Sequence, residues 1–318
     1  MNRTAPQELF RRYRDNPLLT VQDIPYPANT VFNAGVAKVD GETLLLIRVE
    51  DRRGFSHLTV ARSDDGVTGW RVDSEPTFVP SPETNPEETW GIEDARITYI
   101  EELQKWAVVY TAYSDYGPLA SVALTKDFKT FERLGPATPP ENKDAALFPV
   151  RFNGRYAMLH RPVPLCSAAS ADIWISFSPD LKHWGGHRAL VRARGGGWWE
   201  GGKIGLGPPP LQTSEGWFIL YHGVRETVSG GIYRLGLALL DIEDPTCVIR
   251  RSPEWVFGPS EPYERSGDVC NVVFPCGWLL EGDEIKLYYG GADTCIALAF
   301  ASLKEIFEYL RQLPKVNM

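Results

Sequence analysis

One pattern recurs five times along the chain and constrains its fold more than any other feature of the sequence. In each copy a polar or charged residue leads an apolar run, a short polar turn follows, and a second apolar run comes back. The first copy begins at Asn33 and turns at residues 40–42, and the later copies begin at Asp94, Asp144, Lys203 and Asn271. Paired apolar runs with Gly, Asn or Asp between them predict antiparallel β-hairpins.

A third apolar run follows each hairpin and ends in a turn that carries an Asp or a Ser. The turn residues recur at intervals of about 60 residues, and they are Asp65, Asp127, Asp180, Asp241 and Ser302. Five such repeats, each long enough for four short strands, predict an all-β fold: a five-bladed β-propeller with short terminal helices. An irregular β-sandwich is the alternative, although that fold requires no regular period.

Because the repeat is continuous, we expect residues 1–318 to form a single propeller domain. Residues 1–16 are expected to be a polar N-terminal extension with a short helix around residues 7–13. Residues 302–318 are expected to form a C-terminal helix, because the apolar residues between 303 and 310 have helical spacing.

Composition narrows the possible partners and the cellular compartment. The formal net charge of −8 argues against binding to nucleic acid or an anionic membrane. No apolar stretch approaches membrane-spanning length, and the first residues do not resemble a signal segment. The 5 cysteines lack CxxC pairs and the 5 histidines lack paired ligand spacing, so we expect a reducing, cytoplasmic location, no metal site and no cofactor.

The leading residues of the five copies are candidates for a shared site. In a propeller the innermost strand of each blade starts near a central channel, so these polar side chains should meet there. The second strands also end in polar groups, among them Arg48, Tyr113, His160-Arg161, Tyr221-His222 and Asp293. A single such residue is as readily a turn or rim residue, but five copies in the same phase predict a polar pocket.

Asp94 is the strongest carboxylate candidate for acid catalysis. It lies near Trp90, whose apolar cover would raise the pKa of the carboxyl into the range of a proton donor. The alternative is a structural ion pair between Asp94 or Glu93 and Arg96. Trp198, Trp199 and Tyr263 are candidate surfaces for sugar stacking, although such aromatics are more often part of a core.

A set of cations accompanies this carboxylate and suits phosphate or a carboxylate ligand better than an uncharged sugar alone. Its members are Arg48, Arg52, Arg53, Lys143, Arg161, Lys203 and His222. Arg52 and Arg53 could instead lie on a solvated loop. The glycine- and proline-rich segment 205–210 lacks the features of a nucleotide-binding loop, and we interpret it as a rigid loop that aims Lys203.

Several of these motifs, taken together, resemble glycoside hydrolase family 130. They are Arg48-Val49-Glu50-Asp51, Gly91-Ile92-Glu93-Asp94-Ala95-Arg96, Leu159-His160-Arg161-Pro162, the segment 203–209 and the segment 288–293. The resemblance runs from about residue 16 to the last repeat, and one departure is Ala95, where this family often has Pro. The family comprises β-mannoside phosphorylases and some β-mannosidases with five-bladed propellers.

The resemblance implies roles for individual residues. Asp94 is then the general acid, whose proton passes through the 3-hydroxyl of the sugar. The expected ligands of the mannosyl ring are Asn33, Arg48, His160, Tyr233 and Asp293. The expected ligands of phosphate are Arg53, Lys143, Lys203 and His222, although neighbouring basic residues could replace Arg53 or Lys143.

The implied reaction is phosphorolysis of a β-mannoside with inversion, in which inorganic phosphate is the co-substrate and α-mannose 1-phosphate the product. One outstanding acid with a cluster of cations favours this reaction over hydrolysis, which requires a second carboxylate as base. A β-mannosidase with Glu200, Asp268 or Glu264 as base is the alternative, and a non-catalytic carbohydrate-binding propeller is a third. The linkage (1,2 or 1,4), the acceptor sugar and the oligomeric state, including a homo-oligomer, stay open.

Overall fold

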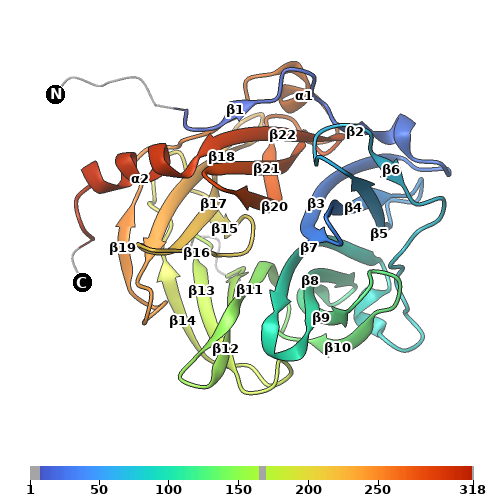
Figure 1. Cartoon of the computed structure of the whole chain (residues 1–318), viewed down its shortest axis with the longest axis horizontal. Coiled ribbons are helices and arrows are strands. Elements are labelled where there is room, and N and C mark those ends of the chain that lie inside the picture. The colour runs from blue at the N-terminus through green and yellow to red at the C-terminus, as the bar shows by residue number, and fades with distance from the viewer. Residues whose placement is uncertain (1–7, 165–169, 317–318) are drawn as a thin grey trace.

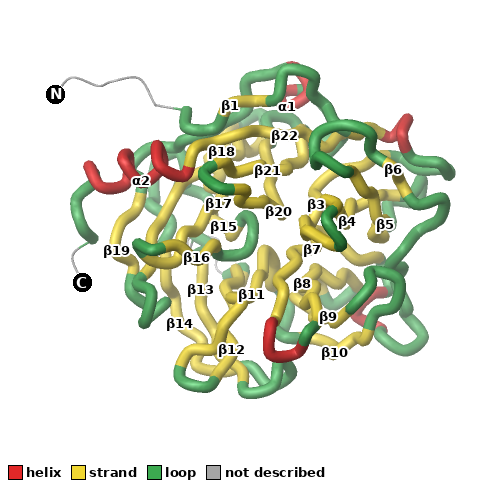
Figure 2. The backbone as a smooth tube through the Cα atoms, viewed as in Figure 1, coloured by secondary structure: helices red, strands yellow, loops and turns green. Residues whose placement is uncertain are grey.

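The computed structural model describes residues 8–164 and 170–316 of the chain. The predicted all-β class is confirmed, because strands form most of the molecule and helices are few and short (Figures 1 and 2). Within the described residues the strands form four sheets, and the largest of them consists of two antiparallel halves. We number these two halves and the other three sheets as groups 1 to 5. Each group begins with one of the five predicted hairpins, so the repeat in the sequence is a repeat in the structure.

In the part of the chain that the structure describes, the first three groups have four strands each. Group 1 consists of β3 (Thr30–Val39), β4 (Glu42–Glu50), β5 (Ser56–Ser63) and β6 (Arg71–Val72). Group 2 consists of β7 (Gly91–Ile100), β8 (Lys105–Ser114), β9 (Gly117–Thr125) and β10 (Glu132–Pro136). Group 3 consists of β11 (Asn142–Phe152), β12 (Arg155–Pro162), β13 (Ile173–Ser178) and β14 (Gly185–Val191). A single parallel pairing, Ser56 with Gly91, joins the first two groups.

The last two groups contain extra short strands. Group 4 consists of β15 (Lys203–Leu206), β16 (Leu211–Thr213), β17 (Gly216–Thr227), β18 (Gly230–Leu240) and β19 (Val248–Arg251). Group 5 consists of β20 (Val273–Glu281), β21 (Glu284–Gly291) and β22 (Cys295–Ser302), with β1 (Arg11–Arg12) and β2 (Leu19–Thr20) paired to β22. Short helical turns lie between strands: η1 (Val21–Asp23), η2 (Pro86–Glu88), η3 (Glu101–Leu103) and α1 (Pro262–Arg265).

The N-terminal segment differs from the prediction. Among the described residues from 8 onward it forms no helix, and Arg11 and Arg12 pair as strand β1 with Phe300 and Ala299 of β22 (Figure 1). The prediction was wrong because the outer edge of β22 offers unpaired backbone groups, which an extended segment satisfies and a helix does not. The first residues of the described chain therefore complete the last group.

The predicted C-terminal helix is present as α2 (Leu303–Gln312). Ser302 caps it by accepting a hydrogen bond from the backbone N–H of Glu305. Its apolar face, Ile306, Phe307 and Leu310, is buried against the fourth and fifth groups. Neither this helix nor any other in residues 8–164 and 170–316 is long and apolar enough to cross a membrane.

The recurring Asp residues stabilise the turns that follow β5, β9, β13 and β18. One carboxylate oxygen accepts hydrogen bonds from the backbone N–H groups two and three residues further on. This geometry is present at Asp65, Asp127, Asp180 and Asp241. The sequence marker therefore reports local turn chemistry rather than a functional site.

Five hydrophobic clusters hold the groups together, and each cluster joins two of them. They lie between groups 1 and 2, groups 2 and 3, groups 3 and 4, and groups 4 and 5. The remaining large cluster packs Tyr288, Ile296 and Leu298 of group 5 against β3 and β4 of group 1. Packing thus proceeds in cyclic order and returns to its start.

Candidate active site

A cavity of about 520 Å³ receives side chains from all five groups. Its charged and polar lining consists of Asn33, Arg48, Asp94, Glu141, Lys143, Asp144, Arg161, Lys203, His222, Tyr233 and Asp293. Phe274, Val269 and Val272 add an apolar wall. The predicted convergence of the leading residues in one polar pocket is therefore found for Asn33, Asp94, Asp144 and Lys203.

Backbone geometry explains how the first strands aim these residues. Asn33, Asp94 and Asp144 have φ angles of 48°, 52° and 55°, in the left-handed region. Each lies where the register of its strand shifts, so each is the extra residue of a β-bulge. Asn and Asp tolerate this conformation better than most residues because their short polar side chains bond locally. The bulge turns each side chain out of the strand and into the pocket.

Glu93 and Asp94 form the centre of a buried charge network. The guanidinium of Arg48 donates to Asp94 Oδ1 and to Glu93 Oε1, each at 3.0 Å. Asn33 Nδ2 donates to Asp94 Oδ1 at 2.9 Å, and Lys143 Nζ donates to Glu93 Oε2 at 3.0 Å. Although burial alone would raise it, the pKa of Asp94 lies below its ordinary value because of Arg48, Lys143 and Arg96 and the Asn33 hydrogen bond.

The expected effect of Trp90 on this pKa was therefore wrong. Trp90 is 38% exposed and packs edge-on against Tyr113, so it does not provide the apolar cover that the sequence suggested. The alternative ion pair with Arg96 is also absent among the described residues. Arg96 donates to the backbone oxygen of Asp94 at 3.0 Å and lies nearer the carboxylate of Asp144, at 3.4 Å.

Asp144 is the centre of a second cluster. Its Oδ2 accepts a hydrogen bond from Arg161 Nε at 2.8 Å and lies 3.5 Å from His222 Nε2. Burial would raise the pKa of Asp144, but Arg161, His222 and Arg96 hold it well below its ordinary value. Arg96 also donates to the backbone oxygens of Leu206 and Gly207, which fixes the loop that follows Lys203.

His222 is a buried residue of the pocket lining. Burial, together with Arg161, Arg96 and Lys203, lowers its pKa to about 3 despite the opposing charge of Asp144, so the ring is neutral at pH 7. Its Nδ1 has no hydrogen-bond partner within residues 8–164 and 170–316. Gly205 makes this arrangement possible, because a Cβ there would collide with Asp144 Oδ2 and the His222 ring.

Asp293 is the one carboxylate of the described pocket whose pKa is raised, to about 7. Burial is the main cause, and the charges of Asp94, Glu93 and Asp268 add to it, while Arg48 opposes it. Its backbone oxygen accepts from Thr30 Oγ1 at 2.7 Å. A carboxyl with this pKa exchanges its proton near neutral pH.

Comparison with known proteins identifies the family of this chain. Residues 3–312 match the profile of glycoside hydrolase family 130, described as β-1,4-mannooligosaccharide phosphorylase. The chain belongs to this family. The resemblance seen in the sequence is therefore confirmed.

Several family members resemble the chain over nearly its whole length. A β-1,2-mannobiose phosphorylase of Listeria innocua is 37% identical, over 94% of this chain and 98% of its own. A β-1,4-mannooligosaccharide phosphorylase of Ruminococcus albus is 36% identical, over 96% of this chain and 92% of its own.

Solved structures agree in fold. The Listeria innocua β-1,2-mannobiose phosphorylase in complex with β-1,2-mannobiose superposes with a TM-score of 0.86 at 35% identity, covering 95% of this chain and 99% of that one. Another structure, from a description of family 130 glycoside hydrolases that target β-1,2-mannosidic linkages in Candida mannan, gives a TM-score of 0.82 at 26% identity. It covers 93% of this chain and 94% of that one.

Within this family 130 chain, eight of the ten residues proposed from the sequence lie together in the pocket. They are Asp94, Asn33, Arg48, Tyr233, Asp293, Lys143, Lys203 and His222. The other two lie elsewhere. The side chain of Arg53 is 74% exposed and pairs with Asp51 at 2.7 Å, so the alternative of a solvated loop is correct for this residue.

His160 is buried away from the pocket lining. Its Nδ1 lies 3.1 Å from Asn142 Oδ1 and its Nε2 lies 2.6 Å from Ser176 Oγ. Successive strand residues point to opposite sides, so its neighbour Arg161 faces the cavity instead. The sequence offered no means of choosing between these two adjacent residues.

Glu93 and Arg161 have a larger part in the charge networks of the pocket than the sequence suggested. Glu93 connects Arg48 to Lys143, and Arg161 neutralises Asp144. The signal in the sequence that could have identified them is their polar character within strand patterns.

None of the proposed stacking aromatics, Trp198, Trp199 and Tyr263, is in the described lining of the pocket. Trp199 donates a hydrogen bond to Pro253 O, and Tyr263 contacts Tyr289 and Asn16.

Proposed function

We propose that this protein is an inverting β-mannoside phosphorylase. Phosphate attacks the anomeric carbon of a β-mannoside and yields α-mannose 1-phosphate and a shortened acceptor. The observation that carries this proposal is the shared pocket, in which Asp94 lies among Arg48, Lys143, Arg161 and Lys203. The activities named for the relatives at 36–37% identity support it.

The fold that carries this pocket is, in our proposal, a five-bladed propeller. The five strand groups would be its blades, since hydrophobic clusters join neighbouring groups in cyclic order and join the fifth to the first. Strand β1 would close the ring as the outermost strand of the last blade.

Sugar and phosphate are assigned to different sets of pocket side chains. Asn33, Arg48, Tyr233 and Asp293 come from groups 1, 4 and 5 and present amide, guanidinium, phenol and carboxyl groups that suit sugar hydroxyls. Lys143, Lys203 and His222 come from groups 3 and 4, and Arg161 lies with them. Cations and the imidazole of His222 suit the oxygens of phosphate.

Asp94 is assigned the role of general acid. In the free site it is ionised, because the surrounding cations lower its pKa. A bound phosphate anion would offset those cations and raise this pKa. Asp94 can then take a proton from H2PO4⁻ and pass it to the leaving oxygen, while an oxygen of the resulting HPO4²⁻ forms the new bond to the anomeric carbon, the glycosidic bond breaks, and the phosphate keeps its remaining proton.

The carboxylates considered as the base of a hydrolase do not support hydrolysis. Glu200 and Glu264 are fully buried and bonded to arginines outside the pocket lining. Asp268 is exposed. Phosphate, by contrast, is already anionic and needs positioning rather than deprotonation.

The test is to incubate the protein with β-1,2- and β-1,4-linked mannobiose, with and without phosphate, and to follow α-mannose 1-phosphate by phosphorus NMR. We expect product only with phosphate and on one of the two linkages preferentially. Equal release of mannose with and without phosphate would overturn the proposal in favour of a β-mannosidase. The variant Lys203→Ala should raise the KM for phosphate at least tenfold, whereas Lys129→Ala, on an exposed turn, should not.

A further inference from the structure

Three glutamates outside the pocket are completely buried: Glu88, Glu200 and Glu264, each with an exposure of 0%. Each lies on the connection that precedes the first strand of a group, before β7, β15 and β20 respectively. Within the described chain, each carboxylate is bonded by one tyrosine hydroxyl and at least one arginine. We call these three arrangements the Glu–Tyr–Arg triads.

The triads have equivalent members. In group 2 Glu88 accepts from Tyr110 at 2.7 Å and Arg133 at 2.9 Å. In group 4 Glu200 accepts from Tyr221 at 2.9 Å and Arg251 at 2.8 Å. In group 5 Glu264 accepts from Tyr289 at 2.8 Å and Arg12 at 2.7 Å. The tyrosine is always on the second long strand (β8, β17, β21), and the arginine is always on the outermost strand (β10, β19, β1).

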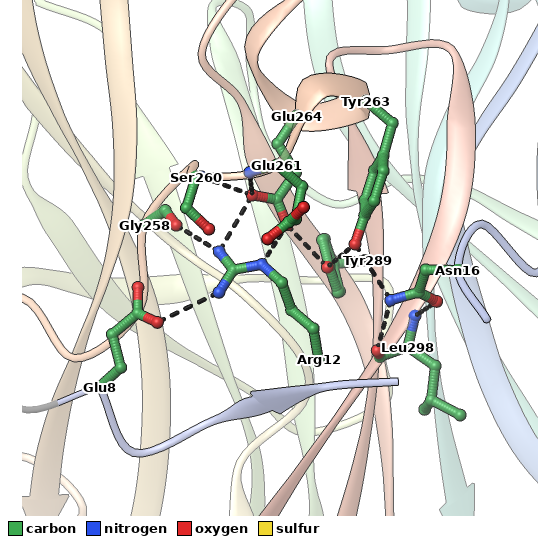
Figure 3. A network of polar contacts seen from close by, with 10 residues as sticks. All are labelled: Glu8, Arg12, Asn16, Gly258, Ser260, Glu261, Tyr263, Glu264, Tyr289 and Leu298. Atoms are coloured by element: carbon green, nitrogen blue, oxygen red, sulfur yellow. Dashed lines mark hydrogen bonds and ion pairs between the residues drawn. The ribbon is translucent and has the colours of Figure 1, made fainter. Parts of the chain in front are cut away.

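The triad of group 5 takes its arginine from the other end of the chain (Figure 3). Arg12 bonds both oxygens of Glu264 and also the backbone oxygen of Gly258. The same carboxylate accepts from the backbone N–H groups of Ser260 and Glu261, at 2.7 and 3.1 Å. One buried carboxylate thus ties strand β1, strand β21 and the connection 258–264 together.

Group 3 has an uncharged counterpart of the triad. His160 on β12 stands in the place of the tyrosine, and Asn142, at the start of β11, bonds its Nδ1. Ser176 bonds its Nε2 and relays the contact to His187 on the outermost strand β14. This explains why His160 is turned away from the pocket: it occupies a framework position that recurs in the repeat.

The energetics favour a fixed geometry. A buried carboxylate is costly unless it is fully hydrogen-bonded, and such a network is satisfied only in one arrangement. Burial and the adjacent glutamate raise the pKa of Tyr110 and Tyr289 well above 10, so both hydroxyls remain donors. Loss of one partner would leave a buried charge unpaired and allow the connection to move.

Each connection continues directly into the pocket. Asp94 follows Glu88 by way of Trp90, whose backbone N–H donates to Tyr113 O. Lys203 begins β15, close after Glu200 in the sequence. From Glu264 the route is hydrogen-bonded throughout. Val272 N donates to Glu264 O at 3.0 Å and Ala292 N donates to Val272 O at 3.1 Å, next to Asp293. Tyr233 N donates to Asn271 O at 3.0 Å.

We propose that the three glutamates are positioning residues, each for a different part of the reaction. Glu88 positions Asp94, Glu200 positions Lys203, and Glu264 with Arg12 positions Tyr233 and Asp293. The N-terminal segment thereby helps to position side chains that are assigned to the sugar. This assignment of roles rests on the proposed phosphorylase function.

The experiment compares the steady-state kinetics of Glu88→Gln, Glu200→Gln and Glu264→Gln with varied sugar and varied phosphate. We expect Glu200→Gln to raise the KM for phosphate about tenfold and Glu264→Gln to raise the KM for the sugar about tenfold, each with the other KM nearly unchanged. Glu88→Gln should mainly lower kcat. Glu215→Gln, which removes a surface pair with Arg311, is the matched control and should change none of them.

Thermal unfolding of each variant separates positioning from stability. If the variants lower kcat only, in proportion to the fraction unfolded, and leave both KM values unchanged, the glutamates are only structural and the proposal is overturned. Should Glu264→Gln not fold, Arg12→Lys retains a cation and must still raise the sugar KM selectively. The same assay on the wild-type protein tests the proposed function before any variant is made. If the wild type shows no phosphate-dependent turnover, the proposed function is refuted.

Discussion

Replacing Asp293 by Asn should stabilise the protein increasingly as the pH rises. The folded protein holds the pKa of Asp293 at about 7, against an ordinary 3.8, chiefly because the carboxyl is buried. Between these pH values the folded state binds the proton more tightly than the unfolded chain does, so wild-type stability from this group is lost as the pH rises. Asn has a similar shape, tolerates the positive φ of 55° and does not titrate.

The magnitude follows from the pKa difference. Each pKa step of one corresponds to about 1.4 kcal/mol, so the full penalty above pH 7 is about 4 kcal/mol. Between pH 5 and pH 8, the free energy of unfolding of the wild type should fall relative to Asp293→Asn by about 3 kcal/mol. Most of this change should lie below pH 7, with a slope of about 1.4 kcal/mol per pH step.

Urea denaturation of both proteins at pH 5, 6, 7 and 8 measures this difference. Asp115→Asn, on the exposed turn between β8 and β9, is the control and should give a curve parallel to wild type. If the wild-type and Asp293→Asn curves are also parallel over this range, Asp293 does not retain a proton in the folded state. The account of the pocket electrostatics would then be wrong.

Three further predictions concern the pocket. Asp94→Asn should lower kcat by about 10² to 10⁴ while calorimetry still detects sugar binding, since the amide cannot transfer a proton; unchanged turnover would exclude Asp94 as the acid. Arg48→Lys should lower the free energy of unfolding by about 3 kcal/mol in denaturant titrations, because one ammonium cannot serve Glu93, Asp94 and Ser56 together. Gly205→Ala should weaken phosphate binding at least tenfold by displacing His222, whereas Gly185→Ala, which meets open space, should bind phosphate normally in the same calorimetric titration.

Much of the fold was predictable because the sequence repeats its local signals. Hairpin turns such as residues 40–42, and the Asp turns of groups 1 to 4, depend only on neighbouring residues. The N-terminal strand was not predictable in the same way. Arg11 and Arg12 become extended only because the edge of β22, far away in the sequence, supplies their partners.

Part of the site was predictable, because the position of a residue in the repeat determines whether its side chain points into the pocket. Asn33, Asp94 and Asp144 share one phase of the pattern, and all three are in the pocket. The protonation of Asp94 was predicted wrongly because it depends on Arg48 and Lys143, from other groups, rather than on the nearby Trp90. The sequence could not show which of His160 and Arg161 faces the pocket. A shift of the strand register by one residue exchanges the two faces of the sheet, and the sequence alone does not fix that register.

The left-handed backbone at Asn33, Asp94 and Asp144 has a consequence for attempts to redesign this enzyme. At these positions a library that samples all twenty amino acids would consist mostly of destabilised members, since β-branched and large residues cost about 1–2 kcal/mol each in this conformation. The residues that this backbone conformation tolerates there are Asn, Asp and Gly. New acceptor preferences should therefore be sought at ordinary strand and loop positions of the wall, such as Val269, Val272 and Phe274, where side-chain size can vary without opposing the backbone.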